Sequence, residues 1–132
     1  MLNKAILLTT MSKVTLVYKA TITVGTNGAY ERGFSATTDY TSNMFGSASL
    51  FEGENILLYL CDYEVSSGNK ICSALLTTKN GKLRVVNETT GVELELVHYK
   101  DYEFGYSYTS QSYGGIFDGI ANDQSCIISI YA

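Results

Sequence analysis

The stretch that decides the fold is VTLVYKATITV, residues 14–24. Its even-numbered positions hold Val, Leu, Tyr, Ala, Ile and Val, whereas the odd-numbered positions hold Thr, Val, Lys, Thr and Thr. Because successive side chains of a β-strand point to opposite faces, this two-residue period predicts one long strand with one buried face. The strand ends at GTNG, 25–28, where the Asn27-Gly28 pair tolerates the positive φ angles of a tight hairpin turn.

Similar strand-length runs follow along the whole chain, with turn signals about every ten residues. They are AYERGFSA (29–36), ASLF (48–51), ILLYLCDY (56–63), ICSALLTT (71–78), KLRVVNE (82–88), VELELVHY (92–99) and SCIISIYA (125–132). Nothing repeats with the 3.6-residue period of a helix. The sequence therefore predicts one all-β domain over residues 1–132, an antiparallel β-sandwich of the jelly-roll kind or a small barrel of eight to ten strands.

Local features refine this prediction. The near-continuous apolar run 56–63 predicts a strand covered on both faces, and Asn80-Gly81 predicts a second hairpin turn. The Thr-, Ser- and Asn-rich residues 36–46 predict a loop. Residues 1–12 are interpreted as a docking arm or edge strand, because their apolar part, AILL, is too short for a signal peptide or a membrane span.

Composition and charge exclude several classes of partner. Hydrophobic residues make up 45% of the 132 residues, which argues against disorder. The formal net charge is −4, and no two of the nine Lys and Arg residues are adjacent. A nucleic acid or an anionic membrane surface requires clustered positive charge, so neither is expected as a partner, and no membrane insertion is expected.

The cysteine and histidine residues offer no recognisable reactive centre. Cys61, Cys72 and Cys126 lie in apolar runs without CxxC spacing, as expected of buried thiols in a reducing cytoplasm. A Cys61–Cys72 bridge across a hairpin stays open as an alternative. His98, the single histidine, is in phase with Leu94 and Leu96 on the apolar side of its strand, which predicts a structural histidine with a partner.

The acidic residues also suggest no catalytic or metal site. Four carboxylates lie near the two ends of the run 56–63, and they are interpreted as solvated turn charges in preference to a glycosidase pair: Glu52, Glu54, Asp62 and Glu64. Asp118 and Asp123 resemble a calcium loop only loosely, since the EF-hand spacing is missing. The sequence therefore predicts no catalytic residue, no metal and no cofactor.

The most distinctive stretch is YEFGYSYTSQSYGGIFDG, residues 102–119. Its first four aromatic residues are spaced two apart, which predicts that they share one strand face. The SQSYGGIFDG part (110–119), with its three glycines, predicts a flexible loop able to carry contacts. A tyrosine hydroxyl prefers water or a partner, so this row suits a sheet rim or subunit contact. Interface or ligand candidates are Tyr102, Phe104, Tyr106, Tyr108, Tyr113 and Phe117.

A resemblance adds to this picture. The elements RGFS (32–35), FGSAS (45–49), GENILLYLCD (53–62) and NGKL (80–83), in this order, resemble small proteins encoded among bacteriophage and prophage tail and fibre genes. The resemblance covers about a third of the chain and ends at residue 83. It implies a component of the virion, made in the cytoplasm of the bacterial host, such as a tail, baseplate or fibre accessory or a capsid decoration protein.

Together these observations predict a non-enzymatic structural protein whose partners are other copies of itself and other virion proteins. The apolar ends AILL (5–8) and IISIYA (127–132) are expected to add strands to a partner sheet. The alternative is a carbohydrate- or receptor-binding β-sandwich, with a host surface glycan as the partner of a tyrosine-rich face. An enzyme is the least favoured of the three interpretations.

Overall fold

The computed structural model describes residues 15–37 and 43–132, so the predicted docking arm lies outside the described residues. Within these ranges the chain forms ten strands and no helix. The strands are β1 (Leu16–Thr23), β2 (Gly25–Asn27), β3 (Glu31–Ser35), β4 (Ser47–Glu52), β5 (Leu57–Ser66), β6 (Asn69–Leu76), β7 (Lys82–Asn87), β8 (Glu93–Asp101), β9 (Tyr106–Ser110) and β10 (Ser125–Tyr131).

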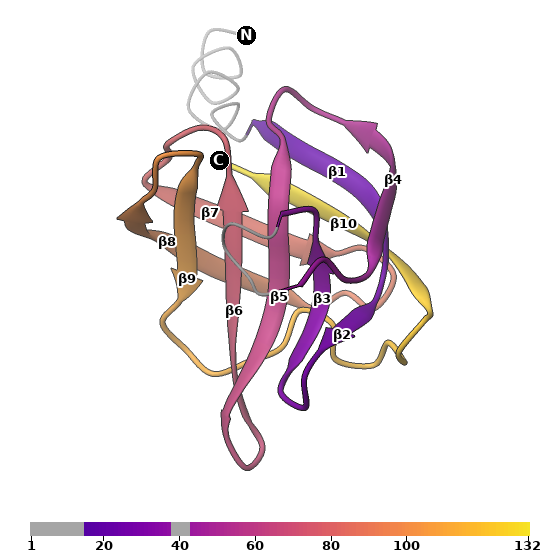
Figure 1. Ribbon diagram of the computed structural model, residues 1–132. Coiled ribbons are helices and arrows are strands. Elements are labelled where there is room, and N and C mark those ends of the chain that lie inside the picture. The colour runs from indigo at the N-terminus through magenta and orange to yellow at the C-terminus, as the bar shows by residue number, and fades with distance from the viewer. Residues whose placement is uncertain (1–14, 38–42) are drawn as a thin grey trace, which may run out of the picture.

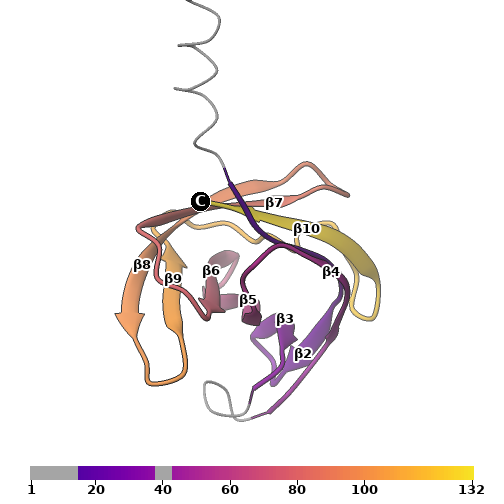
Figure 2. The same ribbon diagram turned by 90° about the horizontal axis from the view of Figure 1, so that it is seen from above.

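All ten strands belong to one antiparallel sheet that curls into a nearly closed barrel. The strand order is β2-β3-β5-β6-β9-β8-β7-β10-β1-β4, so β2 and β4 are its edges. In Figure 1 the upright strands β3, β5, β6 and β9 lie in front of β1, β7 and β10, which cross behind them at a steep angle. Figure 2 shows the same strands from above as the outline of a ring. The all-β prediction is confirmed.

The alternating stretch that opens the sequence is also confirmed. Tyr18, Ala20, Ile22 and Val24 are buried in the main core, whereas the odd-numbered side chains of β1 are mostly partly exposed. The Asn27-Gly28 turn forms as predicted, with Gly28 at a φ of 66°. Burial of one strand face against the opposite wall is the main favourable term in forming such a barrel.

Glycines allow the barrel to close between its two edges. The backbones of Gly25, Gly33 and Gly46 approach one another closely, since a Cβ on Gly25 would lie 2.1 Å from the backbone nitrogen of Gly46. A Cβ on Gly33 would lie 2.2 Å from the carbonyl oxygen of Leu60 on the paired strand β5. A Cβ on Gly46 would lie 2.3 Å from the carbonyl oxygen of Gly33. Both residues also have positive φ angles, 148° and 64°, which side chains disfavour. We call these three glycines the seam.

A second, smaller hydrophobic cluster covers the outer face of β5. Its buried members are Phe45, Tyr59, Cys61 and Leu75, with Tyr102 and Phe104 packed against them. The opposite face of β5 contributes Leu57 and Leu60 to the main core. The predicted burial of residues 56–63 on both faces is therefore correct for the centre of this strand.

Three local predictions were wrong. Asn80-Gly81 lies in the connection between β6 and β7, which do not pair, so it forms no hairpin. Residues 127–132 cannot add to a partner sheet as an edge strand because β10 is already paired on both sides, with β7 and β1. The aromatic row from Tyr102 to Tyr108 is interrupted by a turn, in which the Tyr102 N–H donates to the carbonyl of Gly105 (2.8 Å).

The three cysteines are free and buried, as predicted. Cys61 belongs to the outer cluster, whereas Cys72 belongs to the main core on the other face of the sheet. Their side chains point to opposite faces, which excludes a Cys61–Cys72 bridge in this fold. Desolvation raises the pKa of all three thiols, for Cys126 to about 11, so none is a ready nucleophile.

Candidate functional site

The six aromatic candidates do not form one surface. Tyr102 and Phe104 lie in the β8–β9 turn and pack on the outer cluster, whereas Tyr106 and Tyr108 face the main core. Tyr108 and Phe117 are completely buried and Tyr113 is 66% exposed. The turn at 102–105 reverses the chain and so separates side chains that a continuous strand would have aligned.

The hydroxyl group of Tyr108 makes two hydrogen bonds. It donates to the carbonyl oxygen of Thr78 at 2.5 Å and accepts from the N–H of Asn80 at 2.9 Å. These bonds fix the connection between β6 and β7, the segment that carries the Asn-Gly pair. Tyr108 therefore ties one part of the barrel wall to another.

His98 has the partner that its position predicted. Its Nε2 atom lies 2.6 Å from Oδ1 of Asp101, and its ring packs edge-on against Tyr108 with centroids 5.9 Å apart. Asp101 also forms an ion pair with Lys79 at 3.3 Å. Although desolvation opposes it, hydrogen bonding from Lys79 and His98 lowers the pKa of Asp101. The side chains of His98 and Asp101 are 24% and 53% exposed, so the His98–Asp101 pair stabilises the barrel surface. The three cysteines are buried in the two clusters.

One of the four carboxylates near β5 is not a turn charge. Asp62 is only 3% exposed, which corrects the expectation that all four are solvated. Its two oxygens accept the backbone N–H groups of Ile116 (2.9 Å) and Phe117 (2.8 Å). Glu52 and Glu54 are exposed, as expected. Sequence reasoning missed Asp62 because a carboxylate near a strand end is usually solvated, although its alternation with Leu60, which lies in the main core, points to the inner face.

The edge strand β4 carries two strongly exposed apolar side chains. Leu50 is 81% exposed and Phe51 is 65% exposed, and every residue of the strand except Ala48 is exposed. Among the described residues, the backbone of β4 is bonded only to β1. We call residues 47–52 the β4 edge. It lacks lysine and proline, two usual means of protecting an edge strand.

A bulge in this strand turns its apolar side chains outward. The register with β1 shifts between Thr21 and Lys19, whose partners are Ser49 and Glu52. Within the bulge Leu50 has a φ of 56°, a left-handed conformation that costs a branched side chain about 1–2 kcal/mol. The ring of Phe51 contacts that of Tyr18 at a centroid distance of 5.9 Å. Strain of this kind is often kept where it serves a contact, and it marks the β4 edge as a candidate interaction surface.

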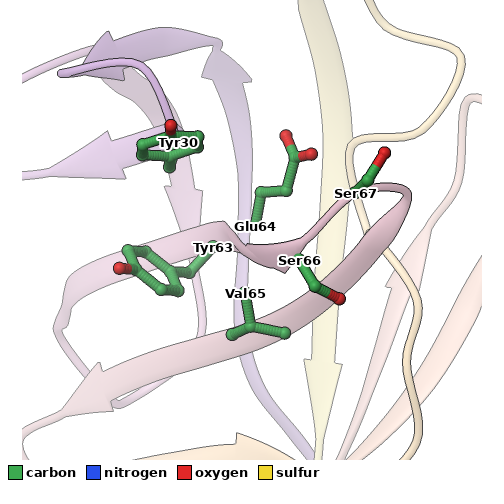
Figure 3. A pocket seen from close by; sticks show the side chains of 6 residues that line it. All are labelled: Tyr30, Tyr63, Glu64, Val65, Ser66 and Ser67. Carbon is green, nitrogen blue, oxygen red and sulfur yellow. The ribbon is translucent and has the colours of Figure 1, made fainter.

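A second candidate lies at the lower end of the barrel, where the β2–β3 and β5–β6 hairpins run side by side. The Glu64 N–H donates to the carbonyl oxygen of Tyr30 at 2.9 Å and so joins the two hairpins. The hollow has a volume of about 410 Å³, and Figure 3 shows the side chains around it. Its lining residues are Tyr30, Tyr63, Glu64, Val65, Ser66 and Ser67. We call it the hairpin hollow.

Two other kinds of site are absent from residues 15–37 and 43–132. No three His, Cys, Asp or Glu side chains there come together in a way that could hold a metal ion. The same part of the chain contains no helix with the length and hydropathy needed to cross a membrane.

Comparison with known proteins returned nothing similar. No family model, no curated protein and no solved structure matches this chain.

Proposed function

We propose that this chain is a non-enzymatic structural component of a phage virion that acts through protein–protein contacts, and that the β4 edge is its contact surface. The single observation that carries the contact surface is the exposure of Leu50 and Phe51 on an edge strand. The tail, baseplate, fibre or capsid setting comes from the sequence resemblance in residues 32–83.

The chemistry of the β4 edge favours another protein chain as its partner. An edge strand offers unpaired backbone N–H and C=O groups, which a second strand can satisfy by β-augmentation. Burying the large apolar side chains beside it stabilises a complex by about 25 cal/mol per Å² of apolar surface removed from water. The bulge at Leu50 limits strand pairing to the first half of β4 and presents Leu50 and Phe51 as apolar anchors for the partner.

The solution mass of the protein over a range of concentrations tests this proposal. The wild type is expected to form a species larger than the monomer, and Phe51→Ser is expected to weaken its formation at least tenfold. Tyr99→Ser is the matched control, since Tyr99 on β8 is 68% exposed and lies far from β4 in the strand order. A wild type that stays monomeric, or two variants that behave alike, would argue against the β4 edge.

The hairpin hollow favours the alternative function, recognition of a carbohydrate or receptor. Two tyrosine rings, a carboxylate and two serine hydroxyls combine stacking surfaces with hydrogen-bonding groups, as sugar sites do. This proposal moves the predicted tyrosine site from residues 102–113 to Tyr30 and Tyr63. Binding to a glycan panel that is lost in Tyr63→Ala and kept in Tyr99→Ala would favour it over assembly.

A further inference from the structure

The segment between β9 and β10 closes the lower end of the barrel. It is the orange-to-yellow connection that crosses the lower part of Figure 1. Ile116 and Phe117 are completely buried in the main core, and Ile120 is nearly so. GGIFDG therefore folds inward, and the flexible contact loop predicted from its glycines is corrected. We call residues 114–120 the plug.

Four groups from the barrel wall hold the plug in place. Asp62 accepts the backbone N–H groups of Ile116 and Phe117, and Asn87 donates from Nδ2 to the carbonyl oxygen of Ile116 at 2.9 Å. At the rim, Lys70 pairs with Asp118 at 2.5 Å. The guanidinium group of Arg32 donates to the carbonyl oxygen of Ile120 and, at 2.7 Å, to Oδ1 of Asn122.

Asp62 is the unusual member of this set, because it is a buried carboxylate without an ion pair among the described residues. The two cations nearest to it, Arg32 and Lys70, are engaged with the plug and its flank. A second carboxylate approaches instead. A Cβ on Gly115 would touch both Oδ1 of Asp118, at 2.6 Å, and Oδ2 of Asp62, at 2.8 Å.

The ionisable groups around Asp62 come from every neighbouring element. They are Tyr30 in the β2–β3 turn, Arg32 on β3, Cys61 and Glu64 on β5, Lys70 and Cys72 on β6, Asp118 on the plug and Cys126 on β10. Desolvation raises the pKa of Asp62 to about 6, against the opposing effect of the two backbone N–H donors. A hollow of about 40 Å³ borders Asp62 and gives solvent protons access to it.

We propose that the plug is a pH-dependent closure of the barrel, seated most firmly when the Asp62 carboxyl group is protonated and loosened when that group ionises. The direction of this pH dependence follows from the linkage between proton binding and plug opening. An open plug exposes Asp62 to water, where its pKa returns toward 3.8, so the open state binds the proton less tightly than the closed state. The ratio of open to closed plug therefore rises with pH between about 4 and 6 and levels off above that range, by about 150-fold in all.

Amide hydrogen exchange at Ile116 and Phe117, read by NMR, tests this proposal, because these two N–H groups donate to Asp62. After correction for the intrinsic exchange rate, the opening equilibrium is expected to rise about tenfold between pH 5 and pH 7. The chemical shifts of the same amide protons are expected to titrate with a midpoint near 6. Asp62→Asn should abolish both effects, and Asp123→Asn, at an exposed carboxylate that follows the plug, should retain them.

Three results would overturn the proposal. The opening equilibrium could be flat between pH 5 and pH 7, or its change could persist in Asp62→Asn. The third is that the amides of Ile116 and Phe117 exchange as slowly as those of Ile128 and Ile130 in β10, which would mean that the plug opens only by global unfolding. If Asp62→Asn does not fold, the wild-type titration and Asp123→Asn still decide the question.

Discussion

Phe117 lies in the main core and Phe51 lies on the proposed contact surface, and substituting each by alanine tests that division. Phe117 is completely buried among the residues of the main core, although its sequence context predicted an interface residue. Truncating a buried phenylalanine removes its transfer free energy and leaves a cavity, at a cost of about 3–5 kcal/mol. Phe51 is 65% exposed and its ring packs against that of Tyr18, so Phe51→Ala should cost less than about 1 kcal/mol.

Urea unfolding provides the assay, followed by far-ultraviolet circular dichroism because the chain contains no tryptophan. The free energy of unfolding is expected to fall strongly in Phe117→Ala and little in Phe51→Ala. A low protein concentration keeps self-association from adding to the apparent stability. The division would be refuted if Phe117→Ala lost less than about 1 kcal/mol, or if Phe51→Ala were the more destabilised variant.

Further predictions follow from the seam, the bulge and the thiols. Gly33→Ala should lower the free energy of unfolding, measured in urea, by at least about 3 kcal/mol. Gly28→Ala also places alanine at a positive φ, but in open space, and should cost about 1–2 kcal/mol. Equal losses in the two variants would contradict close backbone packing at the seam. Leu50→Asn should keep or slightly raise the melting temperature, because asparagine tolerates the left-handed conformation, while the solution mass falls toward the monomer; a clear loss of stability would argue against strain at Leu50. The three thiols should resist a thiol reagent in the native state and all react in denaturant, and fast native labelling would contradict their burial.

The fold class was predictable because it depends on periodicity, which is local. The alternation through Tyr18, Ala20 and Ile22 predicts a half-buried strand whatever its partners are. The Asn27-Gly28 turn was predictable for the same reason, since its strands are neighbours in sequence and in the sheet. Asn80-Gly81 has the same composition, but β6 and β7 belong to different parts of the sheet, and the composition of a turn does not specify which strands it joins.

The candidate sites were less predictable because they depend on the closure of the barrel. The exposure of Leu50 follows from the place of β4 at the end of the strand order, which no local pattern specifies. Asp62 resembles a turn charge until the sheet brings it beneath the plug, more than fifty residues away in sequence. Tyr102 and Tyr108 have the spacing of one strand face, but a turn at Gly105 separates them.

The central claim is that the β4 edge joins this chain to other protein copies. Hydrogen exchange measured at low and at high protein concentration tests it most directly, because a strand that gains a partner gains amide protection. We predict that protection rises with concentration in residues 47–52 and changes little in β8, which is already paired on both sides. Protection that rises elsewhere while residues 47–52 stay unchanged would contradict the claim.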